Sequence, residues 1–421
     1  MKCVETPLRE IFTFSNGINF NKSAYSPGVK LIGVSNFGNR FSPDYEELQE
    51  INRKFVRIGD YLRNGDIIFV RSNGNKELVG RCMLIKDILQ PVTFSGFCIR
   101  ARIKNTREHD PTFFTYYFKS AAFRKAISGN AVGANIQNLS QERLSNYIAC
   151  VPDIVSQRKI ANILSTYDIL IENNQKQIKL LEEAAQRLYK EWFVNFRFPG
   201  YEDTPIVDGV PEGWEKVPVG NLISYEIGGG WGEETPTGKC IREAYVIRGT
   251  DLYGIAHGDL LSIPFRYHVE SNLSSRKLKD GDIVFEVSGG SRTEGVARCL
   301  LITSSMLNVW RKDVMCASFC KLIRPQFGFS QYLHDCIKHL RATGKTEEYD
   351  KRSASSIVNY RWKDFLSQAL VLRPSEEILD HYNGVAKEIY SKAINCSLQI
   401  ESAKKARDRL LPKLMSGEIE V

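Results

Sequence analysis

The chain has 421 residues and lacks the features that mark membrane and secreted proteins. No apolar run reaches the roughly 18 residues that a membrane-spanning helix requires. The opening residues, MKCVETPLREIF, contain acidic residues and a proline too early for a secretory signal peptide. We therefore expect a cytoplasmic protein with no membrane partner, in which the ten cysteines are reduced thiols.

Metal-binding patterns are also missing. Histidine is scarce, and His334 and His339 lie five positions apart, which does not place two ligands on one helical face. Cys316 and Cys320 have no second pair nearby that would complete a tetrahedral zinc site. The cysteines that recur inside apolar segments are more typical of buried small hydrophobic residues than of metal or redox chemistry. No metal site is predicted.

The known signatures of catalysis are absent too. The glycine run 228–230 follows neither G-x-G-x-x-G nor G-x-x-x-x-G-K-[ST] and is more typical of a turn. No N-P-P-Y type methyltransferase motif occurs, and Pro152-Asp153 is not followed by the D/E-x-K of a nuclease. The chain is therefore predicted to be non-catalytic and to bind no cofactor itself.

Neither positive nor negative charge is in large excess. Lys and Arg number 57 against 49 Asp and Glu, and the net charge of +8 permits a polyanionic partner without requiring one. Hydrophobic residues make up 43% and charged residues 25% of the chain, which is ordinary for a globular protein. The length is about twice that of a typical domain and predicts two core-forming units.

An internal repeat accounts for this length. Four pairs of segments recur in the same order: PLREIFTFSNG from Pro7 and PVGNLISYEIGG from Pro218, LRNGDIIF (62–69) and LKDGDIVF (278–285), GRCMLI (80–85) and ARCLLI (297–302), and FSGFC (94–98) and CASFC (316–320). Four matches in one order indicate a tandem duplication with a few loop insertions.

Each copy divides into two parts of different character. The front part alternates short β-branched and aromatic runs with turn residues, which predicts an α+β domain with a curved, mainly antiparallel sheet. The back part predicts one of two long coiled-coil-like helices, which pair antiparallel and hold the two similar domains apart. The predicted boundaries are a first domain at 1–151, a first helix at 152–196, a linker at 197–212, a second domain at 213–373, and a second helix with its tail at 374–421.

Apolar residues alternately three and four apart define the seam between these helices. The predicted contacts are Leu164, Ile171, Asn174, Ile178, Leu181, Leu188, Ile389, Ile400 and Leu410. Asn174 is a polar seam position that would specify register, and Arg407 interrupts the seam of the second helix. About 38 residues at 1.5 Å per residue give a rod near ~57 Å.

Polar loops follow equivalent strands in the two copies. Their candidate DNA-binding residues are Arg71, Asn73, Asn75, Lys76, Asn135, Gln137 and Asn138 in the first copy, and Ser288, Arg292, Lys345, Lys351 and Arg352 in the second. Amide and guanidinium groups can hydrogen-bond base edges. Each loop alone is better explained by a solvated surface, but recurrence in both copies favours a binding role.

The arrangement resembles the DNA specificity subunit (HsdS) of type I restriction–modification systems. The residues that carry the resemblance are the two G-D-I strands, PDIVSQRKIANIL (152–164), VPEGWEKVPVG (210–220) and LLPKLMSGEI (410–419). The chain departs from the family pattern in three places. Cys3 stands near the position equivalent to Trp214, Gly384 lies inside the second helix, and Arg407 breaks its seam.

The resemblance implies two target recognition domains, each of which reads one half of an asymmetric, bipartite site on double-stranded DNA. It also implies two methylation (HsdM) subunits that dock on the helices and carry S-adenosylmethionine. Restriction (HsdR) subunits would add cleavage that depends on ATP and Mg²⁺. The alternative reading is a two-headed scaffold that binds proteins, with the helices as its spacer.

Overall fold

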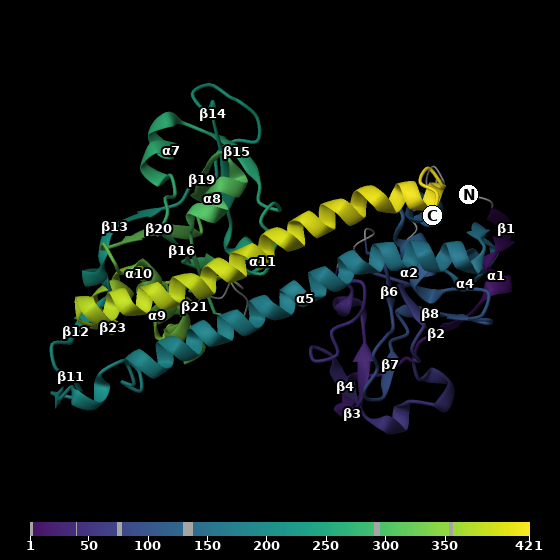
Figure 1. The fold of residues 1–421 in the computed structure, drawn as a ribbon, viewed down its shortest axis with the longest axis horizontal. Helices are drawn as coiled ribbons and strands as arrows, with labels where there is room; N and C mark the ends of the chain where they lie inside the picture. The colour runs from purple at the N-terminus through teal and green to yellow at the C-terminus, as the bar shows by residue number, and fades with distance from the viewer. Residues whose placement is uncertain (1–2, 39, 74–77, 129–137, 290–294, 353–356) are drawn as a thin grey trace. The chain divides into compact units, whose positions relative to one another are not determined.

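The computed structural model describes residues 3–38, 40–73, 78–128, 138–289, 295–352 and 357–421. The chain forms two compact units, residues 1–170 with 403–421, and residues 171–402 (Figure 1). The division falls inside two long helices, α5 (Ile154–Phe193) and α11 (Glu376–Ser416). None of the described helices is both long and apolar enough to cross a membrane.

The first unit contains a four-stranded antiparallel sheet in the order β2-β8-β5-β6 and a three-stranded sheet in the order β4-β3-β7. Strands β1 and β9 form a separate antiparallel pair. The strands are β1 (Cys3–Pro7), β2 (Phe12–Asn16), β3 (Tyr25–Ile32), β4 (Gln49–Ile51), β5 (Ile67–Val70), β6 (Cys82–Leu84), β7 (Val92–Phe94), β8 (Cys98–Ile103) and β9 (Ile148–Pro152). The short helices are α1 (Leu8–Ile11), α2 (Pro111–Lys119), α3 (Ala121–Ser128) and α4 (Gln141–Asn146).

The second unit repeats this topology, with sheets in the orders β13-β20-β16-β18 and β15-β14-β19 and a β12–β23 pair. Its strands are β10 (Ile206–Val207), β11 (Val210–Pro211), β12 (Glu215–Pro218), β13 (Ile223–Gly228), β14 (Arg242–Ile247), β15 (Phe265–His268), β16 (Ile283–Glu286), β17 (Ser288–Gly289), β18 (Cys299–Leu301), β19 (Asp313–Cys316), β20 (Cys320–Pro325), β21 (Asp350–Arg352), β22 (Val358–Tyr360) and β23 (Leu370–Arg373). Its short helices are α6 (Leu252–Ala256), α7 (Glu270–Arg276), α8 (Ser304–Trp310), α9 (Ser330–Ala342) and α10 (Trp362–Gln368).

The two units share even the exception to antiparallel pairing. Strand β3 pairs in parallel with β7, and β14 pairs in parallel with β19, whereas the other strand pairs in these sheets are antiparallel. Such agreement in strand order and direction is what a duplicated sequence requires. The predicted α+β fold class, with two similar domains of mainly antiparallel sheet, is confirmed.

The repeated G-D-I segment builds the centre of each larger sheet. Asp66 is buried and accepts hydrogen bonds from Arg102 Nε at 2.6 Å and Nη2 at 2.7 Å. In the second unit Asp282 is likewise buried and accepts from Arg324 Nε at 2.8 Å and Nη2 at 2.7 Å. A buried carboxylate needs such a bidentate partner, so this aspartate anchors the fold in both copies.

Helices α5 and α11 run antiparallel within each unit. In the second unit Phe193 packs against Tyr382, with ring centroids 4.8 Å apart, and Gln177 lies beside Cys396. The residue number falls along one helix as it rises along the other. In the first unit the ends of the same helices meet where Arg407 pairs with Asp168 at 2.5 Å.

The predicted seam residues differ in burial. Leu164, Ile171, Asn174, Ile178 and Ile400 are buried, whereas Leu181, Leu188, Ile389 and Leu410 are half-buried. Tyr189, beside Leu188, is buried, because its ring packs against Phe193 and Tyr332. The seam therefore also includes large aromatic residues that face the second domain.

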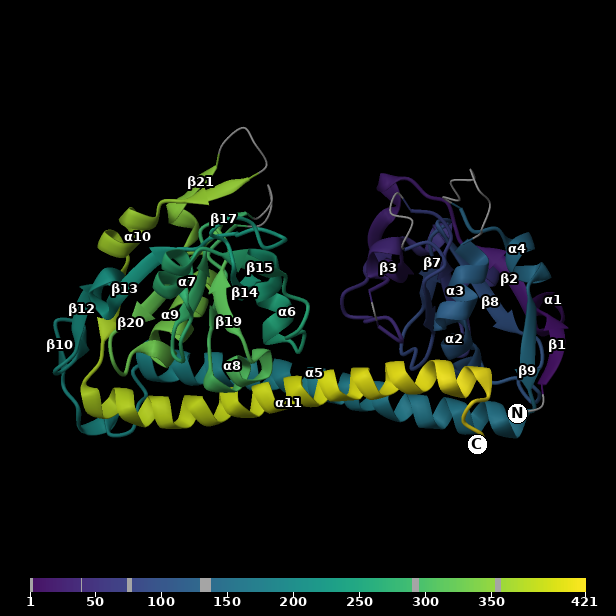
Figure 2. The ribbon, with the colours of Figure 1, turned by 90° about the horizontal axis from the view of Figure 1, so that it is seen from above.

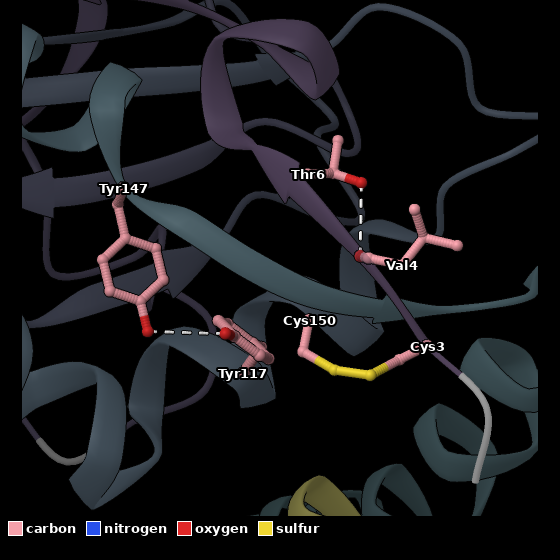
Figure 3. The surroundings of a disulfide bond; sticks show 6 residues. All are labelled: Cys3, Val4, Thr6, Tyr117, Tyr147 and Cys150. Atoms are coloured by element: carbon pink, nitrogen blue, oxygen red, sulfur yellow. Dashed lines mark hydrogen bonds between the residues drawn. A yellow bond between two sulfur atoms is a disulfide. The ribbon is translucent and has the colours of Figure 1, made fainter.

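The structure joins Cys3 of β1 to Cys150 of β9 by a disulfide (Figure 3). Their Cα atoms are 5.4 Å apart, within the usual range for such a bond. The expectation of ten reduced thiols is therefore wrong for this pair. Both residues lie on the same two-stranded ladder, which brings together cysteines that are 147 positions apart in the sequence.

Candidate nucleic-acid interface

In the first unit, three separate segments meet beyond the end of strand β5. The backbone N–H of Arg71 donates to the carbonyl of Phe97 at 2.8 Å, and the Arg71 side chain donates to the carbonyl of Gly96 at 3.3 Å. Ser72 forms an antiparallel bridge with Asn138. We call the segments 71–73, 96–97 and 138 the first polar surface.

The first polar surface includes two of the polar loops predicted from the sequence. Arg71 and Asn73 are half-buried, and Asn138 is exposed. The predicted residues Asn75, Lys76, Asn135 and Gln137 lie outside the described residues. An arginine and two asparagines near one another provide donors and acceptors suited to base edges.

The second unit assembles an equivalent surface from equivalent segments. The N–H groups of Val287 and Ser288 donate to the carbonyl of Phe319 at 2.9 and 3.2 Å. Ser288 of β17 also pairs with Asn359 of β22, and its hydroxyl donates to the Asn359 side chain at 2.9 Å. Strand β22 in turn pairs with β21, which carries the predicted residues Lys351 and Arg352.

We call Ser288–Gly289, Phe319, Lys351–Arg352 and Asn359 the second polar surface. Strands β17 and β21 lie at the end of the second unit that is remote from α5 and α11 (Figure 2). Lys351 and Arg352 are exposed. Two cations on an exposed ribbon are suited to contacts with phosphate groups or with guanine.

Two of the predicted residues in the second copy are not among the residues that define this surface. Lys345 is exposed in the turn after α9, five positions before β21. Burial, with a contribution from the positive charge of Lys345, lowers the pKa of His339 on that helix. Arg292 lies outside the described residues.

Sequence reasoning missed Phe97 and Phe319. Both segments served as signs of the repeat, and only their cysteines received an interpretation. The side chains of Phe97 and Phe319 are 63% and 58% exposed, and their carbonyl groups hold the polar loops in place. The echo of FSGFC in CASFC was a signal that could have pointed to both residues.

The cysteines next to these phenylalanines are buried, as the sequence suggested. Burial raises the pKa of Cys98 to about 12 and that of Cys82 to about 11, so both remain protonated thiols near neutral pH. Among the described residues, no group of three or more His, Cys, Asp and Glu side chains is arranged to hold a metal ion.

Buried polar groups attach each domain to the helices within its unit. In the first unit Asp168 of α5 accepts hydrogen bonds from Tyr116 of α2 and from Arg407 of α11. Arg407 interrupts the apolar seam because it is the ion-pair partner of a buried carboxylate. In the second unit Asp335 of α9 accepts from Tyr382 at 2.6 Å and from Tyr390, both of α11.

Comparison with known proteins shows which family the chain resembles. The model of the type I restriction modification DNA specificity domain matches residues 2–183. The chain is 26% identical over 332 residues to the type I restriction enzyme MjaIX specificity subunit of Methanocaldococcus jannaschii, covering 73% of this chain and 69% of that protein. The chain is similar to type I restriction–modification DNA specificity subunits. The resemblance inferred from the sequence is confirmed.

Other relatives extend over the whole length of the specificity subunit. The HindI specificity subunit of Haemophilus influenzae is 22% identical, and the match covers 95% of this chain and 96% of that protein. The crystal structure of the S subunit from M. genitalium has the same fold, with a TM-score of 0.55 at 13% identity, covering 98% of this chain and 96% of that one. Specificity subunits of this family are non-catalytic.

Proposed function

We propose that this chain is the DNA sequence-specificity subunit of a type I restriction–modification complex and reads an asymmetric, bipartite site. One observation carries the proposal: equivalent segments form a polar surface in each copy, but the side chains differ. Arg71 and Asn73 stand in the first copy where Val287 and Gly289 stand in the second, whereas Ser72 and Ser288 are equivalent. Dissimilar donors and acceptors select dissimilar bases, so one chain would read two different half-sites.

The proposal includes the partners and the chemistry that they would supply. Double-stranded DNA would contact the two polar surfaces, and two methylation subunits and the restriction subunits would bind this chain. S-adenosylmethionine, ATP and Mg²⁺ would belong to those partners, and the complex would act in the cytoplasm. The domains 1–151 and 213–373, the helical segments 152–196 and 374–421 and the linker 197–212 are part of the proposal.

Methylation mapping tests this function. The chain is co-expressed with its methylation subunit, and N6-methyladenine is located across the host genome by single-molecule sequencing. We expect one motif with two unequal blocks of specified bases and a constant gap. Cells that express the methylation subunit alone are the control. Methylation without a two-part motif, or methylation that does not require this chain, would refute the proposal.

Salt dependence provides a second test. Contacts between cationic side chains and phosphates release counterions, so the affinity of the purified complex for DNA should fall steeply with salt concentration. A scaffold that binds proteins through an apolar interface would show little salt dependence. The measurement therefore separates the proposed DNA contact from the scaffold alternative.

A further inference from the structure

Phe97 and Phe319 occupy the same position in the two copies and are both largely exposed. Their side chains are 63% and 58% exposed, although the residues before and after each turn are buried. A single exposed phenylalanine is ordinary on a protein surface. Here two such residues occupy one position of a duplicated fold, and each belongs to a polar surface, so we looked for one role that both share.

Backbone hydrogen bonds hold the turn that carries each ring. Phe97 lies in a tight turn that the N–H of Cys98 closes by donating to the carbonyl of Ser95 at 2.9 Å. The corresponding turn around Phe319 is closed by Cys320 donating to Ala317 at 2.8 Å. Because the carbonyl of each phenylalanine also accepts from the neighbouring polar loop, the turn cannot rotate to bury the ring without breaking these bonds. The turn that carries each exposed ring is therefore preorganised for a contact outside the domain.

The surroundings indicate the chemistry of that contact. Arg71 and Ser72 donate backbone hydrogen bonds to Phe97, and Val287 and Ser288 donate to Phe319. The ring in each copy thus lies next to groups that suit base edges. In the grooves of DNA, apolar side chains contact the thymine methyl group or insert between base pairs, which complements the hydrogen bonds of polar neighbours.

We propose that Phe97 and Phe319 are the apolar base contacts of the first and second polar surfaces, one for each half-site. This inference rests on the proposed function and adds to it the residues that pack against bases. The polar loops would differ between the copies and select different bases, whereas the phenylalanine would supply the same apolar contact in both.

The test uses Phe97→Ala and Phe319→Ala in the full chain, bound to its methylation subunits. Affinity is measured for a duplex that carries the mapped bipartite site and for two duplexes in which one or the other half-site is scrambled. We expect each variant to bind the intact site about tenfold more weakly, which corresponds to about 1.4 kcal/mol. On a duplex with one scrambled half-site, one of the two variants should bind as tightly as the wild type does. On the duplex with the opposite half-site scrambled, the second variant should do so.

Phe327→Ala is the matched control, because Phe327 is 103% exposed and lies at the opposite end of β20 from Phe319. It should leave affinity unchanged. Phe97→Leu and Phe319→Leu keep apolar volume and should restore part of the affinity. Thermal unfolding of every variant should match that of the wild type, which separates loss of contact from loss of fold.

Several results would overturn the inference. Unchanged DNA affinity in both alanine variants would contradict the proposed contact between these rings and bases. An equal loss for Phe327→Ala would indicate a nonspecific effect. Normal DNA affinity with less methylation subunit co-purified would assign the rings to a protein interface instead. Failure of the wild-type chain to direct methylation to a bipartite motif would refute the proposed function itself, and that result is scored before any variant is compared.

Discussion

Glu182 joins helix α5 to the second domain through two cations, and its removal should produce a characteristic pH dependence of stability. Its carboxylate lies 3.2 Å from His257 Nε2 and 3.2 Å from Lys338 Nζ. Burial opposes ionisation, but the two cations outweigh it and lower the pKa of Glu182 from 4.5 to about 2. The pKa of His257 is raised, because the Glu182 carboxylate outweighs the opposing effect of burial.

The size of the effect follows from these values. A carboxyl pKa lowered from 4.5 to about 2 corresponds to about 3 kcal/mol of folding free energy. The side chain is 22% exposed, so solvent screening reduces this to about 2 kcal/mol. For a unit of this size, Glu182→Gln should lower the unfolding midpoint by roughly 4–8 °C.

The signs of the two pKa shifts define the pH window. The contribution of Glu182 is fully present above pH 4.5 and is lost as the pH falls toward 2. The contribution of His257 is fully present below pH 6.5 and is lost as the pH rises through its raised pKa. The stability difference between the wild type and Glu182→Gln should therefore be largest between about pH 4.5 and 6.5.

Urea unfolding from pH 3 to 9, followed by calorimetry, measures this difference. Glu183→Gln is the control, because Glu183 is the exposed neighbour on the same helix and should change stability little at any pH. His257→Gln should remove the loss on the alkaline side and leave the loss on the acidic side. A difference between the wild type and Glu182→Gln that does not vary with pH would refute the reasoning.

Three further predictions test other contacts. Thiol titration of the unreduced protein in denaturant should count eight cysteines if Cys3 and Cys150 are bonded, and a count of ten would contradict the bond. Arg407→Met should destabilise the first unit by about 2 kcal/mol, because it removes a charged partner from a buried carboxylate of α5, and equal urea midpoints for variant and wild type would argue against this role. Replacing Arg71 and Asn73 by alanine should change the base preference in one half of the methylation motif only, and equal weakening of both halves would assign these residues to phosphate contacts.

Much of the architecture was predictable because it depends on local chemistry. Short β-branched and aromatic runs between turn residues predict strands, heptad spacing predicts long helices, and four repeated segments in order predict two similar domains. The G-D-I segment makes the same contact in both copies, since the buried aspartate before one strand pairs with an arginine of the neighbouring strand. The polar loops were identifiable as candidates for the same reason, since equivalent loops follow equivalent strands.

The sequence by itself therefore determined the duplication, the fold class and the family. Only the tertiary structure decided which distant residues meet: Ser72 with Asn138, Ser288 with Asn359, and Arg407 with Asp168. It also decided that Phe97 and Phe319 are exposed beside buried cysteines. Whether a residue is buried, and which residue it contacts, depends on strand register and on helix rotation. These bring together residues that are far apart in the chain, so the local sequence around each residue does not reveal the contact.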